Sequence, residues 1–148
     1  MKIISLLLLT IFLGRGCDKE SRQDIKSANV EYTATTRGFN LKIVVQDQKA
    51  WISNDRSRSG VKPEPVKISD QDWKELLTEF QELDLDEIPN LKWPSERRFY
   101  DGAAIGGLKI VYKDKTYESQ SFDHGYPPVE IERFVNKIVS LAKNEDEN

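Results

Sequence analysis

Residues 28–54 read ANVEYTATTRGFNLKIVVQDQKAWISN, and this segment carries the clearest structural pattern in the chain. Its apolar residues alternate with polar ones in two runs: Val30, Tyr32 and Ala34, then Leu41, Ile43 and Val45. Alternation with a period of two is typical of a strand that buries one face. Turn-forming pairs at 37–38 and 47–48 separate these runs from each other and from a third short run at 49–54. The segment therefore predicts an antiparallel meander of three strands.

Two later segments have the periodicity of helices that are apolar on one side. In the first, Ser69 is a candidate N-cap, and apolar residues recur at i, i+3, i+4 and i+7. These residues are Trp73, Leu76, Leu77 and Phe80. The second helix is expected after a link at 123–128, and its apolar stripe consists of Ile131, Phe134, Val135, Ile138, Leu141 and Ala142. Both helices should pack these stripes against the sheet.

Two more strands are expected between the helices, at 103–112 and 116–122, with a turn at 113–115. The glycines Gly102, Gly106 and Gly107 indicate a bulge or a close backbone approach near the start of the first of them. Residues 55–67 are expected to be a loop, and residues 84–101 to be irregular. The order βββ-α-ββ-α joins strands in hairpins, so it predicts an α+β fold, in which an antiparallel sheet of about five strands carries two helices on one face.

Cys17 is the only cysteine of the chain, and it follows a short apolar run at 3–13. The run is too short to span a membrane, which takes roughly 20 apolar residues, but a basic start and an apolar core are marks of a secretory signal. Residues 1–20 resemble the signal of bacterial lipoproteins. The resemblance implies a diacylglycerol on the Cys17 sulfur, cleavage just before Cys17 and acylation of the new N-terminus. A secreted protein cut by the ordinary signal peptidase, an uncleaved anchor and a cytosolic chain are the alternatives.

This interpretation divides the chain into four parts. Residues 1–16 are the signal peptide, 17–27 the lipidated cysteine and a tether, 28–143 a single α+β domain, and 144–148 an acidic tail. All 25 Asp and Glu would remain after cleavage, while the 22 Lys and Arg would lose Lys2 and Arg15, so the mature charge is −5. An acidic balance argues against nucleic-acid binding, which needs a basic face.

The candidate functional residues lie in two loops: Arg97, Arg98, Asp101, Asp123, His124 and Tyr126. His124 is the only histidine, and its side chain is the one that most readily moves protons near neutral pH. Asp123 could orient it, or could instead bond backbone amides of a turn that Gly125 completes. One histidine and one cysteine argue against a zinc site, and the chain has no G-x-S-x-G nucleophile elbow. We therefore expect no metal and no cofactor.

The pair Arg97-Arg98 has three possible roles. Its forked donors could hold an anionic ligand, it could form salt bridges with the helix acids Glu75, Glu79 or Glu82, or it could be solvated. The salt-bridged or solvated state is favoured.

The sequence thus favours a lipoprotein of the bacterial cell envelope that is anchored to a membrane and acts as a non-enzymatic binding module. Its partner would be an envelope protein or polymer. The alternatives are a small envelope enzyme that uses Asp101, Asp123 and His124, and a periplasmic inhibitor or immunity-like protein. Clustering of those three side chains in one pocket would favour the enzyme, and scattering would remove it. The element order, with the link DHGYPP before the last helix, is loosely similar to small lipoprotein domains of unknown function, and this similarity implies no activity.

Overall fold

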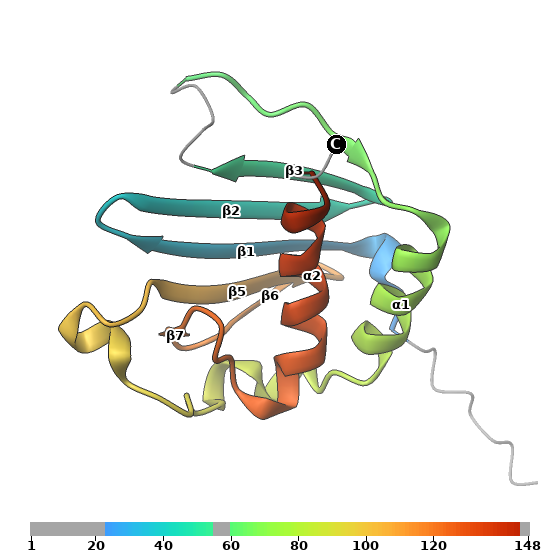
Figure 1. Ribbon diagram of the computed structural model, residues 1–148. Coiled ribbons are helices and arrows are strands. Elements are labelled where there is room, and N and C mark those ends of the chain that lie inside the picture. Colours follow the sequence, from blue (N-terminus) through green and yellow to red (C-terminus); the bar gives the residue numbers. More distant parts are fainter. Residues whose placement is uncertain (1–22, 55–59, 146–148) are drawn as a thin grey trace, which may run out of the picture.

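The meander of residues 28–54 forms as expected in the computed structural model, which describes residues 23–54 and 60–145. Strands β1 (Ala28–Thr36), β2 (Phe39–Gln46) and β3 (Lys49–Asn54) pair antiparallel, with Tyr32 opposite Ile43 and Ile43 opposite Ile52. The apolar residues of the alternation point to the buried side, and Tyr32 and Ile43 have no exposed surface. The predicted α+β fold is therefore confirmed (Figure 1).

The sheet has seven strands rather than about five. Six follow the order β4-β3-β2-β1-β5-β6, and the seventh, β7, also pairs with β5. Strand β5 (Ile105–Tyr112) returns beside β1 and leaves that strand in the middle of the sheet. Strand β4 (Val66–Lys67) adds a short edge strand where we had expected only loop.

The expected strand at 116–122 was wrong in its extent, because it is divided into β6 (Lys115–Glu118) and β7 (Phe122–Asp123). Lys109 faces Glu118 and Gly106 faces Phe122, so between these two pairs three residues (119–121) lie opposite two (107–108). One extra residue of this kind is a β-bulge. A shift by one residue reverses which face each side chain points to, and it brings Phe122 into the core.

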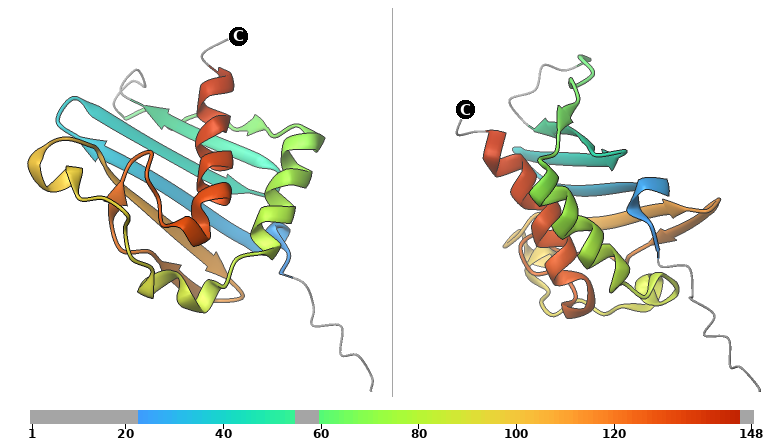
Figure 2. Two further views of the ribbon diagram at one scale, coloured as in Figure 1. Left: turned by 60° about the horizontal axis from the view of Figure 1, so that its bottom comes forward. Right: turned by 90° about the vertical axis from the view of Figure 1, so that its right-hand side faces the viewer.

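Helices α1 (Asp70–Gln81) and α2 (Glu132–Glu145) lie on the same face of the sheet (Figure 2). Ser69 caps α1 as predicted, since its side chain accepts a hydrogen bond from the Asp72 amide. The rings of Phe80 in α1 and Phe134 in α2 lie 5.8 Å apart and join the two helices over the sheet. Most of the two predicted stripes is buried, whereas Leu77 and Ala142 are half-buried. Among the described residues, neither these helices nor any shorter one is long and apolar enough to span a bilayer.

The folded domain begins earlier than the boundary expected at residue 28. Ile25 opens the short 3₁₀ turn η1 (Ile25–Ser27) and is almost completely buried. The side chain of Gln23 donates to the Leu83 carbonyl (2.7 Å), and the Asp24 amide donates to the Tyr112 hydroxyl (3.2 Å). These contacts hold residues 23–27 of the expected tether against the domain. At the other end, α2 continues to Glu145, into the expected tail. The signal peptide and Cys17 lie outside the described residues.

The segment expected to be irregular contains two short 3₁₀ helices, η2 (Leu85–Asn90) and η3 (Arg97–Tyr100). Leu85 and Ile88 of η2 are buried and fasten the segment to the core. A third short helix, η4 (Val129–Ile131), leads into α2.

Alanine substitutions at Gly106 and Gly107 test the bulge and the close approach of Phe122 to the Gly106 backbone. A Cβ on Gly106 would lie 2.9 Å from the Phe122 ring and 3.2 Å from the Phe122 carbonyl oxygen, whereas one on Gly107 would meet only Thr33 Oγ1 at 3.6 Å. Gly106→Ala should therefore lower the free energy of unfolding by about 1–3 kcal/mol, as overpacking of a core does. Gly107→Ala should change it by about 0.5 kcal/mol or less. Urea denaturation of both variants measures the difference, and equal midpoints would contradict the packing described here.

Candidate functional site

The carboxylate of Asp123 lies at the centre of the site and has no exposed surface. One oxygen accepts hydrogen bonds from Ser95 Oγ (2.6 Å) and from the backbone amide of Arg97 (2.7 Å). The other accepts from the backbone amide of Arg98 (2.9 Å) and from its Nη1 (3.1 Å). Asp123 thus bonds backbone amides, as one of our alternatives expected, but they belong to η3 and lie 25 and 26 residues away in the chain.

These contacts fix the charge of Asp123. Burial alone would raise the pKa of this carboxyl, but hydrogen bonds from Ser95, from the Arg98 and Arg97 amides and from the Arg98 guanidinium lower the pKa to about 2. A general base works best with a pKa near the operating pH. Asp123 therefore has the properties of a permanent structural anion.

Arg98 supplies the opposite charge and is also buried, with 6 % of its surface exposed. Besides Asp123, its Nη1 contacts the Ser95 carbonyl (2.9 Å), and its Nε contacts Ser121 Oγ (3.2 Å). The centre of its guanidinium lies 4.2 Å from the ring centroid of Phe99 and 4.9 Å from that of Trp93. Its Nη2 is buried and has no hydrogen-bond partner.

The expected salt bridge of the arginine pair with the helix acids was therefore wrong in its partner. Glu75 pairs with Lys137, and Glu79 pairs with Arg133 (2.8 Å). Arg98 pairs with Asp123 instead.

Arg97, Tyr100 and Tyr126 form an exposed surface beside this ion pair. The Arg97 guanidinium lies 5.0 Å from the ring centroid of Tyr126. Arg97 and Tyr100 lie on one side of η3, because residues three apart in a 3₁₀ helix eclipse each other. Both close over Gly102, where an added Cβ would lie 3.1 Å from the Tyr100 ring and 3.2 Å from Arg97 Cβ. A side chain at residue 102 would require these neighbours to move by a few tenths of an ångström.

Asp101 ends η3 and is exposed. It has a φ of 58°, in the left-handed region that Asp tolerates better than most residues. Its backbone amide donates to the Arg97 carbonyl.

His124 contacts a different set of residues. Its Nδ1 lies 2.6 Å from the hydroxyl of the buried Tyr32, and its ring lies 5.4 Å from that of Phe39. Burial lowers the pKa of His124 from 6.5, and the charge of Lys143 lowers it further. Burial also raises the pKa of Tyr32. At neutral pH both side chains are therefore neutral, and the tautomer of His124 decides which of the two donates their hydrogen bond.

The structure thus brings Arg97, Arg98, Asp123 and Tyr126 together and separates the proposed catalytic set. Asp123 contacts η3, His124 contacts β1, and Asp101 lies at an exposed turn. Sequence reasoning missed Ser95 and Tyr32 as partners. Nothing local marks Ser95, which lies 28 residues from Asp123, or distinguishes the Tyr32 hydroxyl from any other buried tyrosine.

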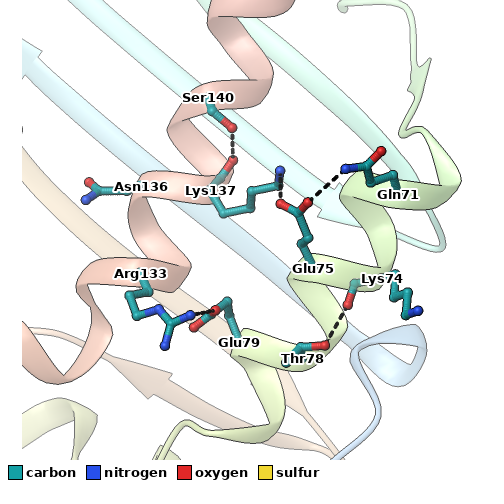
Figure 3. A pocket seen from close by; sticks show the side chains of 9 residues that line it. All are labelled: Gln71, Lys74, Glu75, Thr78, Glu79, Arg133, Asn136, Lys137 and Ser140. Atoms are coloured by element: carbon teal, nitrogen blue, oxygen red, sulfur yellow. Dashed lines mark hydrogen bonds and ion pairs between the residues drawn. The ribbon is translucent and has the colours of Figure 1, made fainter.

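Surface hollows also lie elsewhere on the described residues. One of about 990 Å³ is an open groove between α1 and α2 that is lined by Gln71, Lys74, Glu75, Thr78, Glu79, Arg133, Asn136, Lys137 and Ser140 (Figure 3). Ion pairs between the two helices, Lys137 with Glu75 and Arg133 with Glu79, already engage both of its acids (Figure 3). A second hollow, about 310 Å³, includes Trp51 and Val44 and lies on the sheet face opposite the helices. A third, about 670 Å³, lies between β3, β4 and the end of α2.

Within residues 23–54 and 60–145, no three His, Cys, Asp or Glu side chains are grouped so that they could hold a metal ion. No family model, curated protein or solved structure matches the chain.

Asp123→Asn tests the buried ion pair. The change leaves the Arg98 charge buried without its counterion, so the free energy of unfolding at pH 7 should fall by about 3–5 kcal/mol. Asp101→Asn is a matched control at an exposed position where Asn also tolerates the left-handed conformation, and it should cost about 0.5 kcal/mol or less. Urea denaturation followed by circular dichroism measures both.

The loss of stability caused by Asp123→Asn should depend on pH. The pKa of Asp123 is lowered from 3.8 to about 2. The stability that its ionisation contributes is therefore complete above about pH 5 and is lost as the pH falls through 3.8 and then through 2. The difference in stability between the wild type and Asp123→Asn should narrow between pH 5 and pH 2. A constant difference over that range would contradict a folded-state pKa near 2.

His124→Gln tests whether the titration of His124 contributes to the pH dependence of stability. Since the folded state lowers the pKa of His124 from 6.5, the unfolded chain binds a proton first, and the wild type should lose stability as the pH falls from 7.5 to 5.5. Glutamine can still accept the Tyr32 hydrogen bond, so the variant should lie within about 1 kcal/mol of the wild type at pH 7.5. The loss on acidification should be absent from the variant, because the chain has no other histidine. An unchanged pH slope in the variant would show that His124 titrates normally.

Proposed function

We propose that this protein is a lipoprotein of the bacterial cell envelope, held to a membrane through acyl chains on Cys17, and that its folded domain is a non-enzymatic binding module. The pattern at residues 1–20 supports the anchor: a basic start, a short apolar run, and the single cysteine followed at once by charged residues. The single cysteine fits this proposal, because lipidation would consume its thiol and leave none for a disulfide.

The observation that carries the binding role is the saturation of Asp123. Its two oxygens accept four hydrogen bonds, all from residues 95–98. A catalytic carboxylate must reach the proton that it moves, and this one is enclosed. Nδ1 of His124 is likewise occupied by the Tyr32 hydroxyl. The side chains best suited to acid–base chemistry thus serve to hold loops in place.

The partner proposed for this module is an envelope protein or polymer, and no nucleic acid is expected. The mature charge of −5 gives no general attraction for polyanions.

Cys17→Ala tests the anchor. In a bacterial host supplied with labelled palmitate, the wild type should become labelled and should partition with membranes and into detergent, and the variant should do neither. Stable anchoring needs more than one acyl chain, since each buried CH₂ contributes only about 0.8 kcal/mol. A matched Ser5→Ala variant keeps the cysteine and should be labelled like the wild type. Equal labelling of the wild type and Cys17→Ala would refute the lipoprotein proposal.

A further inference from the structure

The helix η3 and its flanking residues stand out at one end of the sheet. In Figure 1 they form the yellow segment beyond the end of β5, on the side away from α1, and Figure 2 shows the same segment from a second direction. This segment carries two of the most exposed aromatic residues in the described part of the chain, since Phe99 is 64 % and Tyr100 is 72 % exposed. Tyr126, which is 49 % exposed, joins them through its contact with Arg97.

These residues are of the kinds that dominate protein interfaces. Tyrosine, phenylalanine and arginine are enriched at the centres of interfaces, and lysine and glutamate are depleted there. A few such side chains carry most of the binding energy. We call the group Arg97, Arg98, Phe99, Tyr100 and Tyr126 the η3 surface.

The η3 surface is held in place before any partner arrives. The buried ion pair of Asp123 with Arg98 fixes the start of η3, and Gly102 leaves room for Tyr100 and Arg97 to lie close to the backbone of residue 102. A preorganised surface avoids part of the entropy that is lost when loops and side chains become ordered on binding.

Arg98 adds an observation that points to a ligand. Three of its donors are used, by Asp123, Ser95 and Ser121, but its Nη2 is buried without an acceptor. A buried donor that lacks a partner is costly, and native structures contain few of them. The mostly exposed ring of Phe99 covers the guanidinium at 4.2 Å. The Arg98 side chain is only 1 % exposed, so an acceptor on a partner reaches Nη2 only when this one ring rotates aside while the rest of the surface keeps its place.

We propose that the η3 surface is a docking site for a protein segment that carries an acidic side chain next to apolar ones. This inference rests on the proposed binding function and names its surface and the chemistry of its partner. The carboxylate of the partner accepts hydrogen bonds from Arg98 Nη2, and the apolar side chains pack on Phe99, Tyr100 and Tyr126. The guanidinium of Arg97 forms no ion pair within the described residues and supplies a second positive charge at the same place.

A single carboxylate suits this surface better than a polyanion. Glu96 and Asp101 flank the arginine pair in the sequence, and Asp123 neutralises Arg98. Little net positive charge is therefore left to attract a phosphate-rich polymer or an anionic lipid surface. The aromatic residues also need an apolar partner, which a peptide side chain provides.

The probe for this proposal is a random library of 12-residue peptides displayed on phage and selected against the full-length protein in mild detergent. The most enriched peptide is synthesised in two forms, one as selected and one with each Asp and Glu replaced by Asn and Gln. Binding of both forms is measured by fluorescence polarisation. The acidic form should bind at least about tenfold more tightly, as expected for one interaction at the centre of an interface.

Variants locate the site. Arg97→Gln, Tyr100→Ala and Tyr126→Ala should each weaken binding of the acidic peptide by about fivefold to tenfold. Trp51→Ala is the matched control, because it removes a half-buried aromatic residue from the opposite face of the sheet, and it should leave binding unchanged. Nitrogen-15 NMR signals of the Arg98 guanidinium should shift with the acidic peptide and not with its amide form. This readout needs no substitution of Arg98, so the buried ion pair remains intact.

Any of four results would overturn the docking site: no enriched peptide, peptides that bind equally well in the amide form, binding that depends on Trp51 instead of Tyr100, or Arg98 signals that stay unchanged. A fifth, tight binding of polyphosphate or of vesicles rich in phosphatidylglycerol through the η3 surface, would assign the surface to a polyanion. Labelling of Cys17 is independent of all these outcomes. The proposed anchor and the docking site can therefore fail separately.

Discussion

The buried pair of Asp123 and Arg98 is the interaction on which the shape of one whole end of the domain depends. Taking two charges out of water is expensive, and their attraction compensates only when further hydrogen bonds satisfy both groups. Here the carboxylate also binds the Ser95 hydroxyl and two backbone amides, while the guanidinium binds Ser95 and Ser121. Strand β7, the helix η3 and the link before α2 meet at this pair. The bulge between β6 and β7 belongs to the same arrangement, because without it Asp123 would point to the other face of the sheet.

Much of the fold could be predicted from the sequence, because the main elements carry local patterns. The alternation at 28–54 and the stripes of the two helices follow directly from which residues are apolar, and all of these elements formed. The start of the domain at Gln23 and the division of 116–122 could not be predicted in this way. Both depend on contacts with distant residues. Gln23 forms a hydrogen bond with Leu83, and the bulge sets the direction in which Phe122 and Asp123 point.

The candidate site was predicted only in part, for a similar reason. Arg97, Arg98, Asp123 and Tyr126 were recognised by their chemistry, and the structure brings them together. Their pairing was not predictable, since Arg98 had acids of α1 as equally plausible partners and the true one lies 25 residues away. A catalytic pairing of Asp123 with His124 was one alternative, because the two are adjacent. Asp123 ends β7 and His124 begins the turn that follows, and their side chains contact different elements, η3 and β1.

The central position of β1 has a mechanical consequence. A pull on the chain ahead of Gln23 enters the fold through the contacts of residues 23–25 with Leu83 and Tyr112 and then passes directly into β1. This strand is bonded along nearly its whole length to β2 on one side and to β5 on the other. Force applied along the axis of such a strand would load both ladders in shear instead of opening one bond after another.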